Sequence, residues 1–391
     1  MNGARRLSMP YIPIFVVRMS SGANTFLISY LASGGNIIVG FILASYPFVE
    51  ALSSFAAGHM TDILGRRITF IVGYSWILIF MLLLYVMLSL INNPTWVALI
   101  NGLMGFGAAL VLVSTLTMIT DLTERGHRGI GMGVFDFLNI FGYALGYLVG
   151  SVLYQLTTAI NPAYADYSFL ILLTILVVIY AAIVKYIPET KGSIGSKIYL
   201  NPFRGLSRDA WAPLPIWFAI TTILGVAIYA GRALRTIPGI LPIHVGFLLL
   251  GATIVIGLGS VVFGHLSDKI GRVRIMSIGI VGVSIGLAIL TVLLILGINP
   301  LIAVAVASPF IFMASAVVPS ILALTGDKSI ISMRGSSMGL YSLVLGFGMG
   351  AGSILSSYAF SALGLGGIAL AALLIYITAL VLFSIIKFLT K

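Results

Sequence analysis

Long apolar runs alternate with short polar segments along the whole chain. Each run offers roughly the 20 residues that a helix needs to cross the hydrocarbon core of a membrane. None shows the segments of about ten residues with alternating polarity that mark a membrane β-barrel. The pattern predicts an all-α polytopic membrane protein with twelve transmembrane helices, at Met9–Leu31, Ile37–Ala57, Ile68–Leu90, Trp96–Ile119, Ile130–Tyr154, Ser168–Ile187, Ala212–Arg232, His244–Phe263, Ile275–Gly297, Leu301–Leu324, Ser336–Phe360 and Gly367–Ile386.

One polar motif occurs twice, at Gly58–Arg67 and at Gly264–Val273, an offset of 206 residues. Matching residues at one constant offset over many positions indicate an internal duplication. An even number of helices between the copies gives both halves the same orientation, so a pseudo-two-fold axis along the membrane normal should relate them. The same offset pairs Asn93-Pro94 with Asn299-Pro300, Asp121 with Asp327, Arg128-Gly129 with Arg334-Gly335, and Gly142 and Gly146 with Gly348 and Gly352.

The longest polar stretch divides the chain into two halves of six helices each. We predict an N-terminal half over residues 1–187, a central cytoplasmic loop over residues 188–211 and a C-terminal half over residues 212–391. The loops on the opposite face are only a few residues long, so no external receptor domain is expected. Duplicated halves of this kind are typical of proteins that move a solute between the two sides of a bilayer.

The distribution of the few charges predicts the orientation of the chain. Hydrophobic residues make up 60% and charged residues 8%, far fewer charges than the surface of a soluble protein carries. Apart from Arg18, Arg232 and Arg235, every Lys and Arg lies at one face, which the positive-inside rule places in the cytoplasm together with both termini. The net charge of +11 therefore indicates contacts with anionic lipid head groups, and no nucleic-acid partner is expected.

Several kinds of chemistry are excluded. The chain has no cysteine, so it has neither disulfides nor thiolate metal sites. Its histidines have no partners at metal-ligand spacing, and it lacks a Walker-type segment, so no metal, other cofactor or ATP is expected. Gly335–Gly339 fits the G-x-S-x-G pattern of hydrolases but opens a membrane helix instead of following a strand. We predict that the protein is not an enzyme.

The repeated motif places glycines, an acid and arginines at the cytoplasmic ends of two helices. Gly58 and Gly65 allow close helix packing and a tight turn. Asp62 can accept hydrogen bonds from a neighbouring helix N-terminus or pair with an arginine, and Arg66 and Arg67 can bind carboxylates. A single copy would fit an ordinary basic turn, but two copies at the repeat offset indicate a shared function.

This motif resembles the signature between helices two and three of the major facilitator superfamily, and the twelve spans extend the resemblance over the whole chain. The resemblance implies secondary active transport by alternating access, with a substrate site between the halves near mid-membrane. Asp121-x6-Arg128-Gly129, its repeat, and the segment Pro188–Gly192 are similar to elements of sugar porters and related metabolite and organic-ion transporters. Those proteins usually carry Glu where this chain has Asp121.

Ion pairs within these motifs, formed between the two halves, are expected to close the cytoplasmic side and to be broken and remade during transport. Glu189 can accept hydrogen bonds from a gate arginine, although Pro188–Gly192 also fits a plain helix stop followed by a solvated loop. The predicted cytoplasmic gate consists of Gly58, Asp62, Gly65, Arg66, Arg67, Asp121, Arg128, Glu189, Gly264, Asp268, Gly271, Arg272, Asp327 and Arg334.

The motifs leave the substrate open. Helices seven and ten lack the Gln-Gln pair and the G-P-x-P-W run of sugar porters, and Asn101 stands where drug–proton antiporters usually carry Arg. The spacing of Gly142, Gly146 and Gly150 is reminiscent of the exporters' glycine-rich motif and also fits close packing. We predict a monomeric, proton-coupled transporter of a metabolite, organic ion or sugar, with membrane lipids around it. The alternatives are a multidrug/proton antiporter and a non-transporting membrane sensor or scaffold.

Three charges lie within predicted spans of the N-terminal half: Arg18, Glu50 and Asp136. Charges inside a membrane are costly, and they usually face a partner or a wet cavity. Their repeat counterparts are Leu224, Ile256 and Ser342, so packing alone gives no reason for the asymmetry. We predict a cluster in which Arg18 pairs with either acid, or with each in turn, and couples transport to protons. A static ion pair that holds helices together is the alternative.

The candidate coupling or substrate residues also include polar groups outside this cluster. Arg18, Arg232 and Arg235 are candidates for contacting a substrate carboxylate or phosphate, because guanidinium suits planar oxyanions. Alternatively, Arg232 and Arg235 extend to the outer interface. The full set of candidates is Arg18, Glu50, Asp136, Asn24, Asn101 and Arg232.

Overall fold

The computed structural model describes residues 10–123, 128–190, 213–235, 237, 239–328 and 334–389. Within these ranges the chain is helical and contains no β-strand. Many large apolar side chains remain exposed on the outer faces of the helices, as expected where protein meets lipid. The prediction of an all-α polytopic membrane protein is confirmed.

The helices follow the predicted spans closely. Among the described residues, those of the N-terminal half are α2 (Tyr11–Leu31), α3 (Asn36–Leu64), α4 (Arg66–Leu90), α5 (Pro94–Leu122), α6 (Arg128–Ile160) and α7 (Tyr167–Ile183), with short 3-10 turns η2 (Pro162–Tyr164) and η3 (Val184–Tyr186). Those of the C-terminal half are α8 (Leu214–Leu234), α9 (Pro242–Ile270), α10 (Arg272–Ile295), α11 (Pro300–Ala314), α12 (Val317–Lys328) and α13 (Arg334–Leu389).

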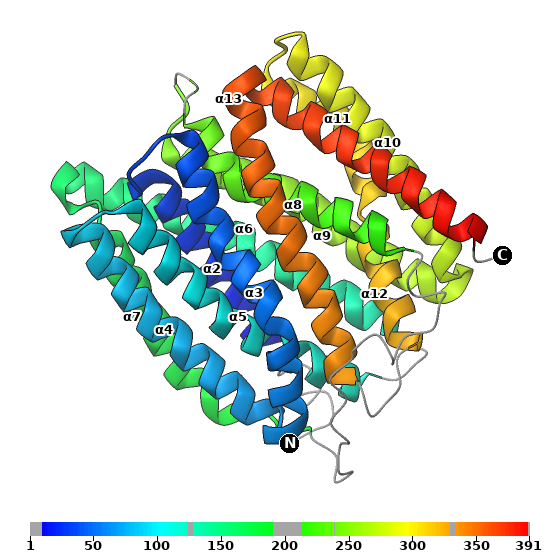
Figure 1. The fold of residues 1–391 in the computed structure, drawn as a ribbon, viewed down its shortest axis with the longest axis horizontal. Coiled ribbons are helices and arrows are strands. Elements are labelled where there is room, and N and C mark those ends of the chain that lie inside the picture. Colours follow the sequence, from blue (N-terminus) through cyan, green and yellow to red (C-terminus); the bar gives the residue numbers. More distant parts are fainter. Residues whose placement is uncertain are drawn as a thin grey trace.

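Three predicted spans differ in form from a single straight helix. The tenth is interrupted at Ser315 and Ala316, which separate α11 from α12. The eleventh and twelfth together form α13, which turns back at Leu363 and Gly364, where the backbone is not helical (Figure 1). Gly364 has a φ of 61°, a conformation that glycine adopts without steric cost. Eleven described helices are long and apolar enough to cross a membrane, and the second segment of α13 supplies the twelfth crossing.

The repeated turn residues have the same local role in both halves. Asn93 and Asn299 cap the N-termini of α5 and α11, each accepting a hydrogen bond of 2.9 Å from a backbone N–H two residues later. Gly65 and Gly271 separate consecutive helices with φ of 98° and 108°, a region that favours glycine. We call the end of the helices with these two glycines the motif end, and the other the opposite end.

Small residues bring the first and fifth helices of each half into close contact. Gly146 of α6 lies against the Met19 carbonyl of α2, and its repeat Gly352 of α13 lies against the Thr222 carbonyl of α8. A Cβ atom at either glycine would overlap that carbonyl oxygen. The Gly-x3-Gly spacing noted in the sequence therefore permits backbone-to-backbone packing, as is common between membrane helices.

The two halves meet along two helix pairs, α3 with the first segment of α13 and α6 with α9 (Figure 1). Glycines again allow the approach: Gly346 of α13 lies on the Pro47 carbonyl of α3, and Gly133 of α6 lies on the Ser260 carbonyl of α9. Between these two helix pairs, α2 and α8 approach each other, and a central cavity lies beside them between the halves.

Candidate functional site

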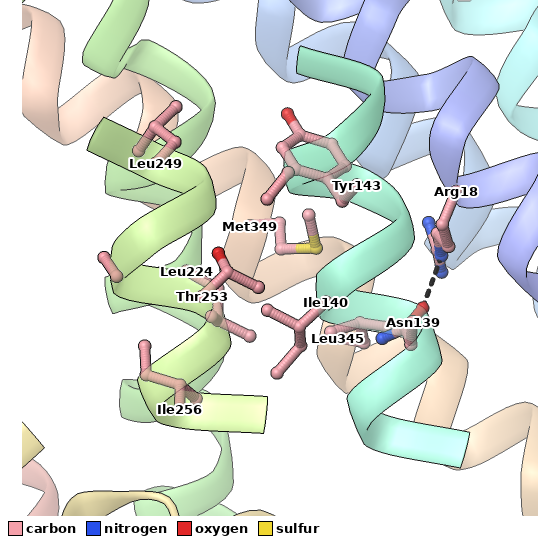
Figure 2. A pocket seen from close by; sticks show the side chains of 12 residues that line it. Arg18, Asn139, Ile140, Tyr143, Leu224, Leu249, Thr253, Ile256, Leu345 and Met349 are labelled. Carbon is pink, nitrogen blue, oxygen red and sulfur yellow. Dashed lines mark hydrogen bonds between the residues drawn. The ribbon is translucent and has the colours of Figure 1, made fainter. Parts of the chain in front are cut away.

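A cavity of about 130 Å³ lies between the halves, near the middle of α2, α6, α8, α9 and α13 (Figure 2). The resemblance implies a substrate site at this position. The C-terminal half contributes apolar walls apart from Thr253, whereas the N-terminal half contributes charged and polar side chains. The lining residues are Arg18, Asn139, Ile140, Tyr143, Ala144, Leu224, Leu249, Ala252, Thr253, Ile256, Leu345 and Met349.

Arg18 and Glu50 form a buried ion pair beside this cavity. The Nη2 atom of Arg18 lies 2.9 Å from Oε1 of Glu50, and Nη1 lies 3.3 Å from Oε2, so the pair is bidentate. Only 3% of Arg18 and 1% of Glu50 is exposed. Bidentate pairs are strong and fix the orientation of both groups, and here they join α2 to α3. The predicted meeting of Arg18 with an acid is present, and that acid is Glu50.

Asn139 of α6 is a third member of the cluster that the sequence analysis missed. Nε of Arg18 donates a hydrogen bond of 2.6 Å to Oδ1 of Asn139 (Figure 2). Asn139 follows Asp136 by about one helical turn, and this spacing on one face of α6 was the available signal. The side chain of Asp136 lies outside the described residues, so its predicted pairing with Arg18 stays a prediction.

The predicted candidates Asn24 and Asn101 lie within the N-terminal half and are absent from the lining of the cavity. Nδ2 of Asn24 donates to Oδ1 of Asn101 at 3.0 Å. Nδ2 of Asn101 donates to the Ile42 carbonyl at 2.9 Å and approaches Oγ of Ser45 at 3.2 Å. This chain of amides joins α2, α3 and α5, so it fits a packing role inside the half better than contact with a solute.

At the opposite end, Arg232 and Arg235 of α8 bind the N-terminal half. Arg232 donates to the Gly34 carbonyl at 3.0 Å and to Oδ1 of Asn36 at 3.2 Å, while Arg235 donates to the Tyr30 carbonyl at 3.1 Å. Carbonyls at a helix C-terminus attract cations, and α2 ends here. We call these contacts between the halves the arginine latch.

At the motif end, the predicted gate residues of the N-terminal half come together. Nε of Arg66 lies 3.3 Å from Oδ2 of Asp121, and its Nη2 lies 3.8 Å from Oδ1 of Asp62. Thr190 donates to the same oxygen of Asp121 at 3.1 Å. The cluster therefore ties α3, α4 and α5 to the segment that follows η3. These ion pairs join elements of one half, whereas the sequence analysis expected the gate pairs to form between the halves.

Glu189 caps the N-terminus of α4. Its two carboxylate oxygens accept hydrogen bonds from the backbone N–H groups of Arg66 at 3.0 Å and Arg67 at 3.1 Å. A carboxylate at this position satisfies donors that have no partner within the helix and interacts favourably with the helix dipole. Pro188–Gly192 is therefore more than a helix stop, because Glu189 holds the motif turn in place.

The C-terminal copy of the motif is similar but is described only in part. Arg272 forms an ion pair with Asp268, and its Nη1 lies 2.9 Å from Oγ of Ser267. Gly264 and Gly271 hold positions equivalent to Gly58 and Gly65. The side chains of the remaining predicted gate residues, Arg128, Asp327 and Arg334, lie outside the described residues.

Comparison with known proteins identifies relatives along the whole length. A family model described as Major Facilitator Superfamily matches residues 11–247 and 234–391. An uncharacterised MFS-type transporter of Methanocaldococcus jannaschii is 26% identical over 350 residues, which are 84% of each chain. The synaptic vesicular amine transporter of Rattus norvegicus is 25% identical over 64% of this chain and 48% of its own length. The methyl viologen resistance protein SmvA of Salmonella typhimurium is 24% identical over 63% of this chain and 45% of its own.

Solved structures share the fold at low sequence identity. The human organic anion transporter MFSD10 superposes with a TM-score of 0.72 and 13% identity, covering 98% of this chain and all of that one. FucP, a transporter solved in the outward conformation, superposes with a TM-score of 0.68 and 14% identity, covering 99% of this chain and 98% of that one. At such identities the likeness concerns the arrangement of helices.

Proposed function

Because this chain belongs to the Major Facilitator Superfamily and is a membrane transporter, we propose that it moves a small organic solute by alternating access, driven by a proton gradient. The observation that carries the proposal is the central cavity between two duplicated halves, with the buried Arg18–Glu50 pair at its wall. A cavity at the interface of two repeats can open to either side when the halves rock against each other.

Coupling to protons is proposed to pass through the Arg18–Glu50 pair. A carboxylate that loses its guanidinium partner in a dry site is poorly tolerated as an anion and takes up a proton. Movement of α2 against α3, or entry of a solute beside Arg18, would separate the pair and create that condition. Asp136, one turn from Asn139, is proposed as a second proton carrier.

The lining of the cavity favours a solute with substantial apolar surface. Arg18 is neutralised by Glu50, and the facing wall is made of residues such as Leu224, Ile256 and Leu345. A sugar needs many directed hydrogen bonds, which these walls do not offer. This observation supports the second candidate function, a multidrug/proton antiporter that exports lipophilic compounds. SmvA, by its name a methyl viologen resistance protein, is compatible with that candidate.

The proposed setting is the cell membrane, with the motif end and both chain termini in the cytoplasm. The positive-inside bias supports this orientation, since the motif end carries Arg66, Arg67, Lys269 and Arg272. We further propose that the chain acts as a monomer, surrounded by lipid, because the central cavity is formed by one chain alone.

Reconstitution tests the proposed function directly. The purified protein is placed in liposomes with an imposed pH gradient and offered pools of metabolites and lipophilic compounds. We expect at least one pool to be accumulated in the presence of the gradient and to equilibrate when an ionophore dissipates it. If no solute is moved under either direction of the gradient, the proposal of proton-driven transport is wrong.

We propose that the predicted cytoplasmic gate controls the rate of exchange. Asp62→Asn should slow solute exchange about tenfold, because the partly buried contact of Asp62 with Arg66 is charge-assisted and contributes on the order of 1.5 kcal/mol to one of the gate states. Arg128→Ala is expected to have a similar effect from its place in the repeated motif. Equilibrium solute binding should change much less. Counterflow of labelled solute and equilibrium binding in detergent measure the two quantities. Lys269→Ala, an exposed charge at the same end, is the control. Exchange at the wild-type rate in both variants would contradict a gating role.

The arginine latch is proposed to hold the opposite end closed. In Arg232→Ala/Arg235→Ala we expect labelling of a buried reporter to become at least about a hundredfold faster, because each arginine contributes charge-assisted hydrogen bonds of about 1.5 kcal/mol or more. Ser29→Cys is a suitable reporter, since Ser29 is fully buried beside the latch and the chain has no other cysteine. A membrane-impermeant maleimide measures its accessibility.

The matched control for the latch is Arg274→Ala, which removes an exposed arginine at the motif end. It should leave the labelling of the Ser29→Cys reporter unchanged. Equal labelling rates in the latch variant and in this control would show that the latch does not set the closed state.

A further inference from the structure

A second cavity, of about 200 Å³, lies inside the C-terminal half. Helices α8 to α12 form most of its walls, with Ile223, Val283, Gly286, Ile311 and Val318 among the lining side chains, and Ile140 of α6 adds to the lining from the N-terminal half. Ser315 is the one described lining residue with a polar side chain, and its hydroxyl donates to the Phe312 carbonyl at 2.5 Å. This C-half cavity is therefore apolar and offers a solute no charge.

The C-half cavity adjoins the central cavity. Ile140, Leu224 and Ile256 line both, so a molecule in one cavity contacts the same three side chains as a molecule in the other. Figure 2 shows Leu224 and Ile256 across the central cavity from Arg18 and Asn139, with Ile140 on the same helix as Asn139. The two spaces together form an elongated site with a polar end at the N-terminal half and an apolar end in the C-terminal half.

The internal repeat shows which side chains differ between the halves at the C-half cavity. Gly282 and Gly286 of α10 correspond, at the repeat offset, to Trp76 and Phe80 of α4. In the N-terminal half these two rings stack at 4.6 Å between centroids. In the C-terminal half the positions are glycines, and a Cβ built at Gly286 has its nearest neighbour, Cβ of Phe310, at 3.4 Å. At Gly286 the absence of a side chain thus leaves space beside the cavity, whereas Gly282 packs closely against α11, where a Cβ would meet Ala314 N and Met313 Cβ at 2.6 Å.

The polar end has hydrogen-bonding groups suited to an uncharged head group. The amide nitrogen of Asn139 and the hydroxyl of Tyr143 lie at the central cavity, and Oδ1 of Asn139 is already occupied by Arg18 (Figure 2). The hydroxyl of Tyr143 is buried and makes no hydrogen bond of ordinary geometry in the described part of the chain, where the Thr25 side chain is the polar group beside it. Such a group gains a hydrogen bond when a polar ligand arrives.

We propose, building on the transport function proposed above, that the solute is amphipathic. A head group that accepts hydrogen bonds lies at Asn139 and Tyr143, and an alkyl or aryl tail passes Leu224 and Ile256 into the C-half cavity. Each methylene buried there strengthens binding about fourfold, from the free energy of transfer out of water. Affinity therefore rises with tail length until the cavity is full and then levels off.

A homologous series of primary n-alkyl amides tests this proposal, with dissociation constants measured on the purified wild-type protein by calorimetry. The key variant is Gly286→Leu, which adds a four-carbon side chain to the C-half cavity. We expect short amides to bind as in the wild type and long amides to bind at least tenfold more weakly, with the plateau at a shorter tail. Gly286→Ala, whose Cβ fits in ordinary contact, should give an intermediate result and guards against misfolding of the larger variant.

Gly251→Leu is the matched control, because a Cβ at this exposed position of α9 meets no neighbour. It should reproduce the wild-type series, including any partition of the amides into detergent. The same rise with tail length in wild type and Gly286→Leu overturns the proposal, as does a flat series in the wild type. If the amides fail in this way while liposomes still accumulate another solute, the tail site is wrong and the transport function stands. Failure of all gradient-driven accumulation would instead count against the transport function.

Discussion

Glu50→Gln should abolish proton-driven accumulation of the solute while preserving solute exchange. Glutamine keeps the size of the side chain and can still accept a hydrogen bond from Arg18, but it cannot carry a proton. Glu50 is 1% exposed and bound to Arg18 at 2.9 Å, so its carboxylate is shielded from bulk solvent while the pair is intact. The measurement is the accumulation ratio in liposomes with an imposed pH gradient, compared with counterflow at equal pH. Asp136→Asn is expected to give the same result.

A double variant separates loss of coupling from loss of folding. Positions 18 and 50 correspond in the repeat to Leu224 and Ile256, so the fold accepts apolar residues at these depths. Arg18→Leu/Glu50→Ile should fold stably, because replacing a buried ion pair by apolar side chains is often neutral or stabilising. Arg18→Leu alone should cost about 3–5 kcal/mol, since it leaves a buried carboxylate without its partner. Thermal unfolding midpoints measure this difference.

Asp166→Asn, at the loop before α7, is the control for removal of an acid far from the cavity. It should retain wild-type accumulation. If Glu50→Gln and Asp136→Asn also accumulate solute with the wild-type pH dependence, the cluster is a static ion pair that holds α2, α3 and α6 together, and the proton path lies elsewhere.

Gly146→Leu should strongly destabilise the N-terminal half. The Cβ and the larger side chain would overlap the Met19 carbonyl, and backbone atoms of α2 can yield only if the two helices separate. Overpacking of a core commonly costs about 1–3 kcal/mol, and a clash with backbone belongs at or above the upper end. We expect the thermal midpoint of the purified protein to fall by more than about 5 °C, or the variant to be lost on expression.

The repeat provides a second test of the same packing. Gly352→Leu should have a similar effect, because Gly352 meets the Thr222 carbonyl of α8 as Gly146 meets α2. Gly251→Leu adds the same side chain at an exposed glycine and should leave the midpoint within a degree or two. A wild-type midpoint for Gly146→Leu would mean that α2 and α6 can separate at little cost.

Much of the fold was predictable because it depends on the length and spacing of local features. Runs of apolar residues must become helices in a membrane, where every backbone polar group needs a partner within its own segment. Glycines, Asn-Pro pairs and the 206-residue repeat located the turns, and Asn93, Asn299, Gly65 and Gly271 have the roles that their residue types suggest. The break at Ser315 and the turn at Gly364 are smaller differences from the predicted spans, because a few residues near a helix end determine where a helix stops.

The candidate site was predictable only where charge made it conspicuous. Arg18 and Glu50 stand out in apolar spans, and their pairing follows from the cost of isolated charges in a membrane. Asn139 and Tyr143 do not stand out, because uncharged polar residues occur throughout these helices. For the arginine latch the sequence singled out Arg232 and Arg235 but not their acceptors, which are mostly backbone carbonyls that every residue carries.

The sequence by itself determined the class of protein, the number of crossings, the duplication and the charged residues that needed partners. Only the tertiary structure decided which faces of the helices meet. These helices are apolar on nearly all sides, so their periodicity does not show how each is rotated about its axis. That rotation follows from close contacts such as Gly146 on Met19, and it places Arg18 beside Asn139. It also leaves the volume at Gly286 empty, because a cavity is a property of several packed helices and of no single segment.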